Sequence, residues 1–475
     1  MRIVPVQTAA GAAAPPAPAQ PLARHLKETV TLALPIIAAR TLILIMFVVD
    51  TIMSGWAGAE QLAFMGLGVA PQLVLMLVAI GALQSVVVMT AQAQGAGDAT
   101  GTGRIFRAGL LHALGLGFLV LTASVFSEAF FLATGQAPGL AAGAARVTTA
   151  FAFGIPGMLA FTATSLFLEA TGRARVGMLI LIAVNLLNIP LNGVVALGWG
   201  GFVEAKGAVG AVAVSSVLRW ASFLAALGFL LADEIRKGDP RRLIVPARVW
   251  AAEAGTLGGE AGRRLRAIGL PMGLAQGVES AAFATIVFIA GLLGTTALAA
   301  HQITMTLVSL IFMGAVGMGG ATAIRVGRAV GAGARADVPR AGWTGIGLGA
   351  LVALPFSALF ATVPDAIARI YTDDPAVLAI TRQTFLVAAT FLSLDAAMGV
   401  AMGALRGTGD VWVPTLMQAS AFWIVAVPVA WIFSAALGLG PVGLLGGILA
   451  GTIASLAFLL PRFSRVSRGR LARLA

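Results

Sequence analysis

Long apolar runs follow one another along almost the whole sequence. A helix needs about twenty apolar residues to cross the hydrocarbon of a bilayer, because each residue advances the helix by about 1.5 Å. The sequence therefore predicts an all-α integral membrane protein with twelve transmembrane helices, and an even number places both termini on one side. The runs begin near Thr29, Gly66, Arg104, Arg146, Val176, Lys206, Arg266, Gln302, Arg340, Thr381, Val411 and Val442.

Composition excludes several other classes of protein. Of 475 residues, 59% are apolar and only 11% are charged, whereas about a quarter of the residues of a soluble domain are charged. The chain has no cysteine, so it contains neither a disulfide nor a thiolate metal site. The net charge of +12 lies mainly between the apolar runs, where basic residues orient a chain in a membrane. We expect no nucleic-acid partner and no cofactor.

Basic residues are distributed very unevenly between the two predicted sides. Of 31 Lys and Arg residues, 25 fall on the side of the termini and four on the other, if Arg325, Arg328 and Arg406 are assigned to inner loops. The last two, Arg40 and Arg219, fall inside predicted spans. Since cytoplasmic loops carry an excess of basic residues, this bias predicts that both termini lie in the cytoplasm. We expect the membrane to be a bacterial inner membrane.

The two halves of the chain repeat each other at an offset of 236 residues. Six helices per repeat give both halves the same orientation, so we expect two six-helix bundles related by a pseudo-two-fold axis along the membrane normal. The predicted parts are a disordered tail (1–24), an N-terminal lobe (25–232), a cytoplasmic linker (233–262), a C-terminal lobe (263–462) and a basic tail (463–475). The matching pairs are Pro35 and Pro271, Gly55 and Gly291, Gly95 and Gly331, and Arg104 and Arg340.

Three acidic residues lie inside predicted spans: Asp50, Glu279 and Asp395. An ionisable group in a span costs at least a few kcal/mol, so each is a functional candidate. None has an acidic counterpart in the other half of the chain, which indicates that the two lobes do different chemical work. Their counterparts are Ile286, Ile43 and Met158, in that order.

Glu279 and Asp395 both fall near mid-membrane in the C-terminal lobe, so we expect them to share one cavity. Two neighbouring buried carboxylates favour a shared proton or a bound cation, because both cannot stay charged and unpaired. Sodium suits such an oxygen-lined site. The alternatives are a structural hydrogen bond from a protonated acid, or a salt bridge to Arg40 or Arg219.

The predicted span that begins near Val176 carries a stripe of amides, Asn185, Asn188 and Asn192, which lie on one helical face. Pro190 frees the carbonyl of Leu186 from its helical hydrogen bond. Such a stripe coordinates a cation or lines a wet cavity, or else it joins helices through interhelical hydrogen bonds.

Four further polar residues are weaker candidates: Gln276, Gln302, Asp373 and Asp374. Gln302 follows His301, which we interpret as structural. Asp373 and Asp374 precede a proline in an outer loop, where we favour a turn with exposed acids over a mouth that attracts cationic substrates.

Four motifs resemble those of the MATE multidrug and toxin extrusion transporters, and especially their NorM-like branch. They are MFVVDTIMSG (46–55), EATGRARV (169–176), AAHQI (299–303) and ALRGTGDVWVP (404–414). The resemblance covers about residues 25 to 462. It implies a V-shaped pair of six-helix bundles that exchanges organic cations for sodium ions or protons.

The resemblance also assigns roles to the candidate acids. It implies that Glu279 and Asp395 match the family's coupling acids in the seventh and tenth predicted spans, and that Asp50 matches the family's acid in the first predicted span. Many DinF-like relatives carry an aspartate where this chain has Asn192, which puts a complete N-terminal cation site in question.

The leading hypothesis is a monomeric secondary antiporter that exports amphipathic, mostly cationic compounds by alternating access. A lipid-linked or oligosaccharide flippase is the alternative, and its central cavity would be expected to carry arginines. An intramembrane enzyme would need clustered catalytic groups, and none is apparent. A primary pump is disfavoured because the chain has no GxxxxGK[ST] phosphate loop.

Overall fold

The computed structural model describes residues 21–469 and residue 471. Within them, twelve helical segments are long and apolar enough to cross a membrane. In the first half these are α1 (Leu22–Trp56), α2 (Ala59–Gly95), α3 (Ala99–Ser124), α5 and α6 (Pro138–Ala170), α7 (Ala174–Leu197) and α8 (Gly207–Arg236). In the second half they are α10 (Gly259–Leu292), α11 (Thr295–Gly331), α12 (Asp337–Thr362), α14 (Pro375–Thr408), α15 to η3 (Trp412–Ala436) and α17 (Gly440–Arg468). The prediction of twelve spans is confirmed.

Short elements join these spans at both ends of the molecule. They are α4 (Ser127–Ala133), η1 (Trp199–Gly201), α9 (Ala247–Gly255) and α13 (Pro364–Ala368). The eleventh span is divided into α15 (Trp412–Ser420), η2 (Ala421–Ala426), α16 (Val427–Trp431) and η3 (Ile432–Ala436). The fourth consists of α5 (Pro138–Phe153) and α6 (Ile155–Ala170).

Most helices begin before the apolar runs that predicted them, by up to eight residues at Pro138. A helix continues past the hydrocarbon as long as its backbone hydrogen bonds persist, whereas an apolar window marks only the buried part. The predicted disordered tail lies outside the described residues as far as residue 20, and residues 22–24 already belong to α1. The predicted basic tail begins inside α17, which continues to Arg468.

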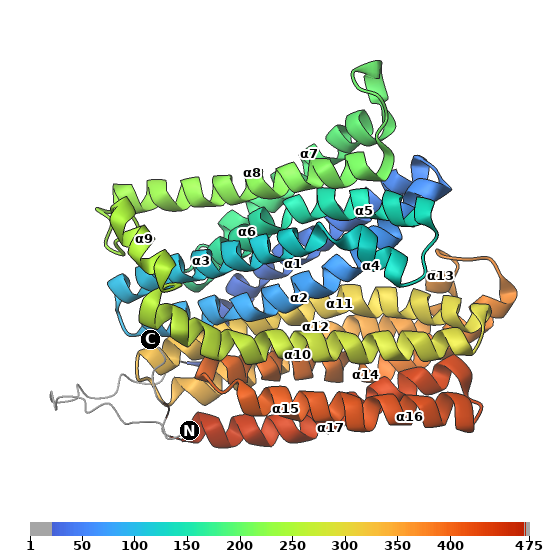
Figure 1. The fold of residues 1–475 in the computed structure, drawn as a ribbon. Coiled ribbons are helices and arrows are strands. Elements are labelled where there is room, and N and C mark those ends of the chain that lie inside the picture. The colour runs from blue at the N-terminus through green and yellow to red at the C-terminus, as the bar shows by residue number, and fades with distance from the viewer. Residues whose placement is uncertain (1–20, 470, 472–475) are drawn as a thin grey trace.

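The helices form two lobes, stacked one above the other in Figure 1. Between them, α1 packs against α11 and α12, α10 packs against α2 and α3, and α2 packs against α11. Exchanging each helix for its repeat counterpart leaves this pattern unchanged, as a pseudo-two-fold axis requires. The described ends of the chain and α9 lie at the same end of the molecule (Figure 1), here called the inner end.

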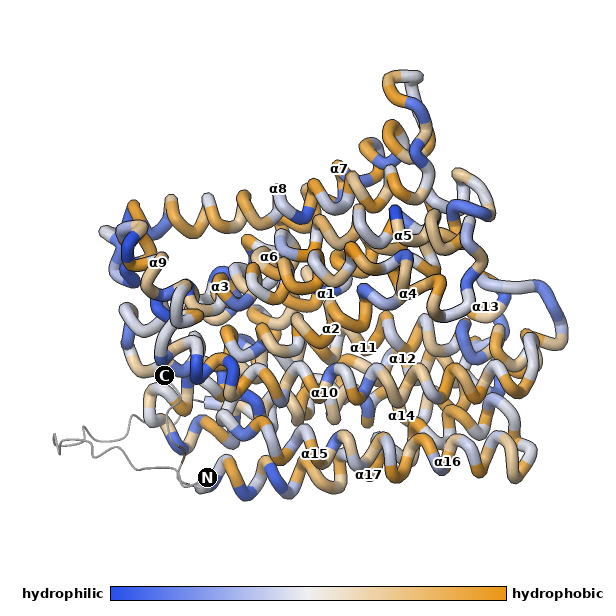
Figure 2. Tube along the Cα trace, in the orientation of Figure 1, coloured by the Kyte–Doolittle hydropathy of each residue, from blue (hydrophilic) through white to orange (hydrophobic). Residues whose placement is uncertain are grey.

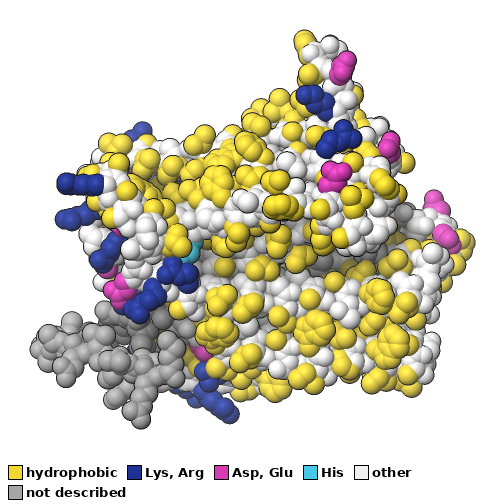
Figure 3. Space-filling view, viewed as in Figure 1, with side chains coloured by type: hydrophobic (Ala, Val, Ile, Leu, Met, Phe, Trp, Pro, Cys, Tyr) yellow, Lys and Arg dark blue, Asp and Glu magenta, His cyan; other side chains and the backbone are white. Residues whose placement is uncertain are grey.

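The distribution of hydropathy in the structure is the one expected of a protein that spans a bilayer. Apolar residues follow the spans, whereas hydrophilic residues concentrate at the two ends (Figure 2). The visible outer faces of both lobes are covered with hydrophobic side chains, and basic side chains gather mainly at the inner end (Figure 3). Large apolar residues such as Leu119, Phe288 and Ile424 are exposed because lipid, which is absent here, surrounds them.

Glycines let the lobes meet closely in the inner half of the molecule. A Cβ added to Gly273 of α10 would lie 2.8 Å from the carbonyl oxygen of Val78 on α2. Near the inner end, Gly95 of α2 faces the backbone of Arg328, and Gly331 of α11 faces the backbone of Gln92. Small residues allow such backbone approach in lipid. The cross-lobe hydrogen bonds between described residues also lie in this half.

Within the C-terminal lobe, glycines of α17 serve the same purpose. Gly443, Gly447 and Gly451 face the backbone or small side chains of the eleventh span, including Ala430 and Ala426. These glycines therefore allow α17 to pack closely against the eleventh span.

Candidate functional site

The N-terminal lobe holds a fully buried carboxylate, Asp50 of α1, surrounded by hydrogen-bond donors. The Ser215 hydroxyl of α8 lies 2.7 and 2.6 Å from the two carboxylate oxygens. From α7, the Asn192 amide donates to Asp50 at 2.7 Å and the Asn188 amide at 3.4 Å. The structure thus brings together Asp50, Asn188 and Asn192, three of the four polar residues that the sequence singled out in this lobe. Ser215 was missed, although two adjacent serines in an apolar span were a signal.

The amide stripe of α7 divides into two parts. Asn188 and Asn192 are four residues apart and reach Asp50, with the Asn188 amide also donating to the Ser215 hydroxyl at 2.9 Å. Asn185 instead donates to the carbonyl of Leu42 on α1 at 3.2 Å and to the Leu181 carbonyl at 2.8 Å. Asn185 therefore joins two helices. Its two neighbours on the stripe hold the carboxylate.

One hydrogen-bond acceptor in the Asp50 cluster has no donor in the described part of the chain. The Asn192 side-chain oxygen is buried without a hydrogen-bond partner among the described residues. An unpaired buried acceptor is costly, and this one lies on a side chain that also touches the Asp50 carboxylate. Two oxygen-bearing side chains side by side are the kind of ligand that a hard cation or a proton donor would satisfy.

Arg219 lies one turn beyond Ser215 on α8, close enough to Asp50 to act on its charge. No ion pair joins the two within the described residues, and the guanidinium carbon lies 4.2 Å from the ring centroid of Phe151. The other intramembrane arginine, Arg40, pairs with Glu169 at 3.1 Å. The alternative that Arg40 forms a salt bridge with a candidate acid is therefore wrong.

A second polar site lies between the lobes, in a cavity of about 80 Å³. It is lined by Gln276 and Glu279 of α10, Gln418 of α15, Arg406 of α14 and Arg40 of α1, among others. Gln418 and Arg406 both lie close enough to the Glu279 carboxylate to act on its charge. With Gln84 of α2, which also lines it, the cavity combines one acid, three amides and two guanidinium groups.

Asp395 lies near this cavity but is not one of the residues that line it. Its side chain is 7% exposed and makes no hydrogen bond to a described residue. It lies near enough to Glu279 for the two charges to interact. The structure thus brings the two acids of the C-terminal lobe near each other, although only Glu279 lines the interlobe cavity. In the described part of the chain, three or more His, Asp or Glu residues nowhere cluster as a metal site would need.

Arg325, Arg328 and Arg406, which were assigned to inner loops, belong to helices. Arg325 and Arg328 lie in the last turns of α11, and Arg406 lies in the last turn of α14. They were assigned to loops because an apolar run in the sequence ends at the first charged residue, whereas the helix itself continues beyond it. As a result, the cavity between the lobes carries Arg406 as well as Arg40.

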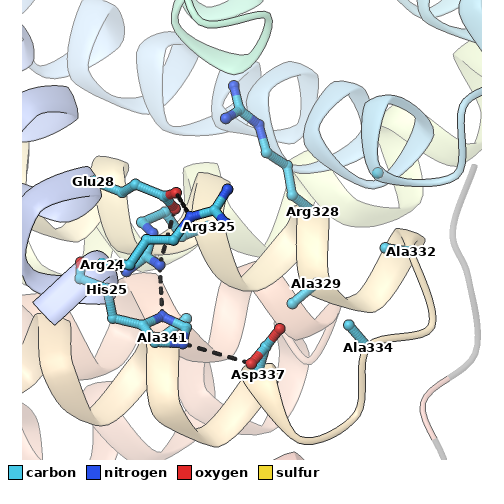
Figure 4. Close-up of a pocket in the computed structure, with 11 residues that line it drawn as sticks. Arg24, His25, Glu28, Arg325, Arg328, Ala329, Ala332, Ala334, Asp337 and Ala341 are labelled. Carbon is cyan, nitrogen blue, oxygen red and sulfur yellow. Dashed lines mark hydrogen bonds and ion pairs between the residues drawn. The ribbon is translucent and has the colours of Figure 1, made fainter. Parts of the chain in front are cut away.

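Arg325 joins the two lobes at the inner end (Figure 4). It donates to the His25 carbonyl at 2.9 Å and to the Thr29 hydroxyl at 2.6 Å, and it pairs with Glu28 at 3.3 Å. His25 in turn lies 3.5 Å from the Asp337 carboxylate of α12. These residues, here called the inner latch, connect the start of α1 to α11 and α12 beside a cavity of about 350 Å³.

The inner latch has no counterpart at the pseudo-symmetric seam between α10 and α2. At the offset of 236, the counterparts of Arg325, Thr29 and Asp337 are Met89, Leu265 and Gly101. Three further bonds between described residues cross between the lobes near the inner end, from Arg328 to the Ala170 carbonyl, from Gln92 to the Gly407 carbonyl and from Arg266 to the His112 ring. The duplicated fold thus closes its inner end asymmetrically.

The weaker candidates lie apart from these sites, except for Gln276. Gln302 is exposed on α11, and its neighbour His301 is buried. Asp374 caps the N-terminus of α14 by accepting from the Ala376 amide at 2.8 Å, and Asp373 beside it is exposed. This arrangement matches the turn that we favoured for these two acids.

Comparisons with known proteins agree with the fold and its duplication. The family model described as MatE matches residues 35–194 and again residues 271–432, two segments that start 236 residues apart. The chain is 33% identical over 468 residues to "Probable multidrug resistance protein NorM" of Caulobacter vibrioides, covering 97% of this chain and 96% of that one. It is 32% identical to "Multidrug resistance protein PmpM" of Pseudomonas aeruginosa, covering 95% of both.

Solved structures share the same arrangement of helices. "Crystal structure of MATE in the straight conformation" matches with a TM-score of 0.81 at 20% identity, covering 94% of this chain and 97% of that one. "Crystal structure of eukaryotic MATE transporter AtDTX14" matches with a TM-score of 0.78 at 16% identity, covering 94% and 99%. The chain therefore belongs to the MATE family of multidrug and toxic compound extrusion transporters, in its NorM-like branch, and is a transporter rather than an enzyme.

Proposed function

We propose that this chain is a secondary active antiporter that exports amphipathic, mostly cationic drugs or toxins in exchange for sodium ions or protons. The observation that carries the proposal is the Asp50 cluster, a carboxylate buried at membrane depth and surrounded by Ser215, Asn188 and Asn192. A buried acid in a span is costly and marks an ion or substrate pathway. The relatives named as multidrug resistance proteins support the substrate class.

Coupling to the ion is assigned to Glu279 and Asp395. Their charges interact within one lobe, and Glu279 reaches the cavity between the lobes. A cation or proton bound by either acid would relieve the repulsion between them. Asp50, with Asn188 and Asn192, is assigned to substrate or cation binding in the other lobe. No cofactor is needed for this exchange.

Alternating access would proceed by breaking the inner contacts between the lobes. The lobes meet in the inner half through glycines and the inner latch, so the described state faces outward. Opening the inner end would separate α1 from α11 and α12. Because the chain packs two lobes around its own central cavity, we propose that one monomer is sufficient for transport.

The inner end is assigned to the cytoplasm of a bacterial cell. The basic residues concentrated there (Figure 3) support this orientation through the positive-inside rule. A reporter that is active only in the cytoplasm, fused after Ala475, is expected to be active. Activity of a periplasm-only reporter at the same position would reverse the assignment.

The flippase alternative gains support from Arg40 and Arg406, which line the interlobe cavity. However, Glu169 pairs with Arg40 and Glu279 lies near Arg406. Both guanidinium groups therefore have an acidic neighbour, and the cavity lacks the excess positive charge that a phosphate-bearing lipid would need.

Transport in proteoliposomes tests the proposal directly. Ethidium is expected to accumulate or leave when a sodium or a proton gradient is imposed, and the gradient that drives it identifies the ion. Liposomes without protein provide the background, and an ionophore that dissipates the gradient should stop the flux. Transfer of a labelled lipid-linked sugar without any ethidium flux would favour the flippase instead.

A further inference from the structure

A groove of about 530 Å³ follows the seam where α3 and α2 of one lobe meet α10 of the other. Its lining is almost entirely apolar and includes Leu116 and Leu119 of α3 and Leu270 of α10. Leu119 and Leu270 are 65% and 57% exposed, so the groove opens on the face that lipid covers. Its volume lies within the range of about 300–1,000 Å³ typical of small-molecule sites.

Gly115 gives the groove its depth. A Cβ added to Gly115 would meet no atom within 4 Å, so this glycine borders open space and is not needed for helix contact. Gly269 of α10 differs, because a Cβ there would lie 2.5 Å from the Ala82 carbonyl oxygen of α2. Gly115 therefore leaves room for a ligand, whereas Gly269 allows α10 to contact α2 at the bottom of the groove.

Arg266 of α10 lies at the inner end of the groove and is held in place. The His112 ring uses Nδ1–H to donate to the Ala108 carbonyl at 2.7 Å, which leaves Nε2 to accept from Arg266 at 3.0 Å. Arg266 also donates to the Leu257 carbonyl at 3.3 Å. No carboxylate pairs with it among the described residues, so its charge is fixed in position and uncompensated.

The depth of Arg266 corresponds to the headgroup region of the inner leaflet. Helix α10 has 34 residues, so about 10 Å, or about seven residues, extends past each side of a hydrocarbon core of about 30 Å. Arg266 is the eighth residue from Gly259, at the boundary. A guanidinium at this depth faces phosphates, while the leucines beyond it face acyl chains.

The pseudo-symmetric seam is built differently. At the offset of 236 the counterparts of Arg266, His112 and Gly115 are Val30, Leu348 and Leu351. The fixed cation next to Val30 is Arg325, which bonds Thr29 and pairs with Glu28, and leucine replaces the open glycine. Because the fold is duplicated, a feature required only by the scaffold would be expected at both seams.

We propose that this groove binds an anionic phospholipid of the inner leaflet, with the phosphate on Arg266 and an acyl chain along Gly115. The charge of Arg266 selects the headgroup, and the apolar walls hold the chain. Basic pockets between transmembrane helices on the cytoplasmic side bind anionic headgroups for this reason. The site is separate from the cavity between the lobes and does not depend on which ion drives transport.

The test measures lipid selectivity in nanodiscs that contain phosphatidylglycerol and phosphatidylcholine. Spin-labelled versions of each lipid report the fraction immobilised on the protein. Arg266→Gln is expected to lower the preference for phosphatidylglycerol by about fivefold, the effect of about one basic residue at a membrane surface. Gly115→Phe is expected to remove the part of the immobilised fraction that is bound in the groove, for both lipids, because it fills the groove, whereas lipid along the rest of the apolar surface stays.

Two matched controls separate this site from general effects. Arg263→Gln removes an exposed charge one turn earlier on α10, and Gly347→Phe adds a ring at an exposed glycine of α12 that also has open space. Both controls should leave selectivity and immobilisation at wild-type values. The proposal is overturned if Arg266→Gln and Gly115→Phe retain wild-type binding, or if the controls reduce binding equally.

Discussion

Replacing Glu279 by Gln or Asp395 by Asn is expected to abolish ion-driven efflux while the protein still folds and inserts. Each change keeps the shape of the side chain but removes its ability to ionise. The two charges interact within one lobe, so losing either one changes cation or proton binding by both. Coupling free energies between two sites correspond to about 5- to 150-fold in affinity, and the linkage of drug to ion should fall by that order.

The measurement is ethidium flux in proteoliposomes under the gradient that drives the wild type, together with ion binding in the presence and absence of drug. Glu128→Gln is the matched control, because Glu128 is an exposed acid of α4 remote from both sites. Wild-type coupled transport by the Glu279→Gln protein would exclude the assigned role.

Asp50→Asn should give a different result in the same assay. Asp50 accepts hydrogen bonds from Ser215, Asn188 and Asn192. An asparagine at this position would place its NH2 group, which only donates, against these hydrogen-bond donors. We expect drug binding in the N-terminal lobe to weaken more than ion binding in the C-terminal lobe. Equal losses of drug affinity and ion affinity would contradict a division of function between the lobes.

Replacing Arg325 by Met is expected to shift the protein toward a state that is open at its inner end. The variant removes the hydrogen bonds to His25 and Thr29 and the ion pair to Glu28, all of which cross between the lobes. Hydrogen bonds to charged groups contribute about 2 kcal/mol, which corresponds to about a thirtyfold shift between two states. The variant destabilises the state in which the latch is formed. A state that is open at the inner end is unaffected, because these contacts are already broken in it.

The shift can be measured as a distance between spin labels at the inner ends of α2 and α11. The chain has no cysteine, so Ala96→Cys and Ala332→Cys provide two exposed labelling sites, one on each lobe. Arg173→Met is the matched control, because Arg173 pairs with Asp233 and Glu234 inside the N-terminal lobe. Identical distance distributions in the Arg325 variant and this control would show that the latch does not hold the lobes together.

The sequence alone was sufficient to predict the number of spans, their duplication and the family. These properties are local or periodic: a run of about twenty apolar residues predicts a span wherever it occurs, and a fixed offset predicts a repeat without any knowledge of packing. The intramembrane acids were also identified this way, since a charge in an apolar run is visible in the sequence itself.

Only the tertiary structure decided which polar groups meet. The spacing of Asn185, Asn188 and Asn192 placed all three on one face, yet Asn185 bonds Leu42 while the other two reach Asp50. The difference depends on how α7 is rotated and tilted against α1 and α8, and helical periodicity does not contain this rotation.

The arginines show the same limit most clearly. Sequence sorting placed Arg325 and Arg406 in loops because hydropathy falls near them, whereas both lie in the last turns of helices. Arg325 latches one lobe to the other, and Arg406 reaches the cavity between them. Hydropathy reports whether a residue prefers water or lipid. It cannot report that a long side chain at a helix end will find its partners on another lobe, because that contact exists only once the two lobes have packed.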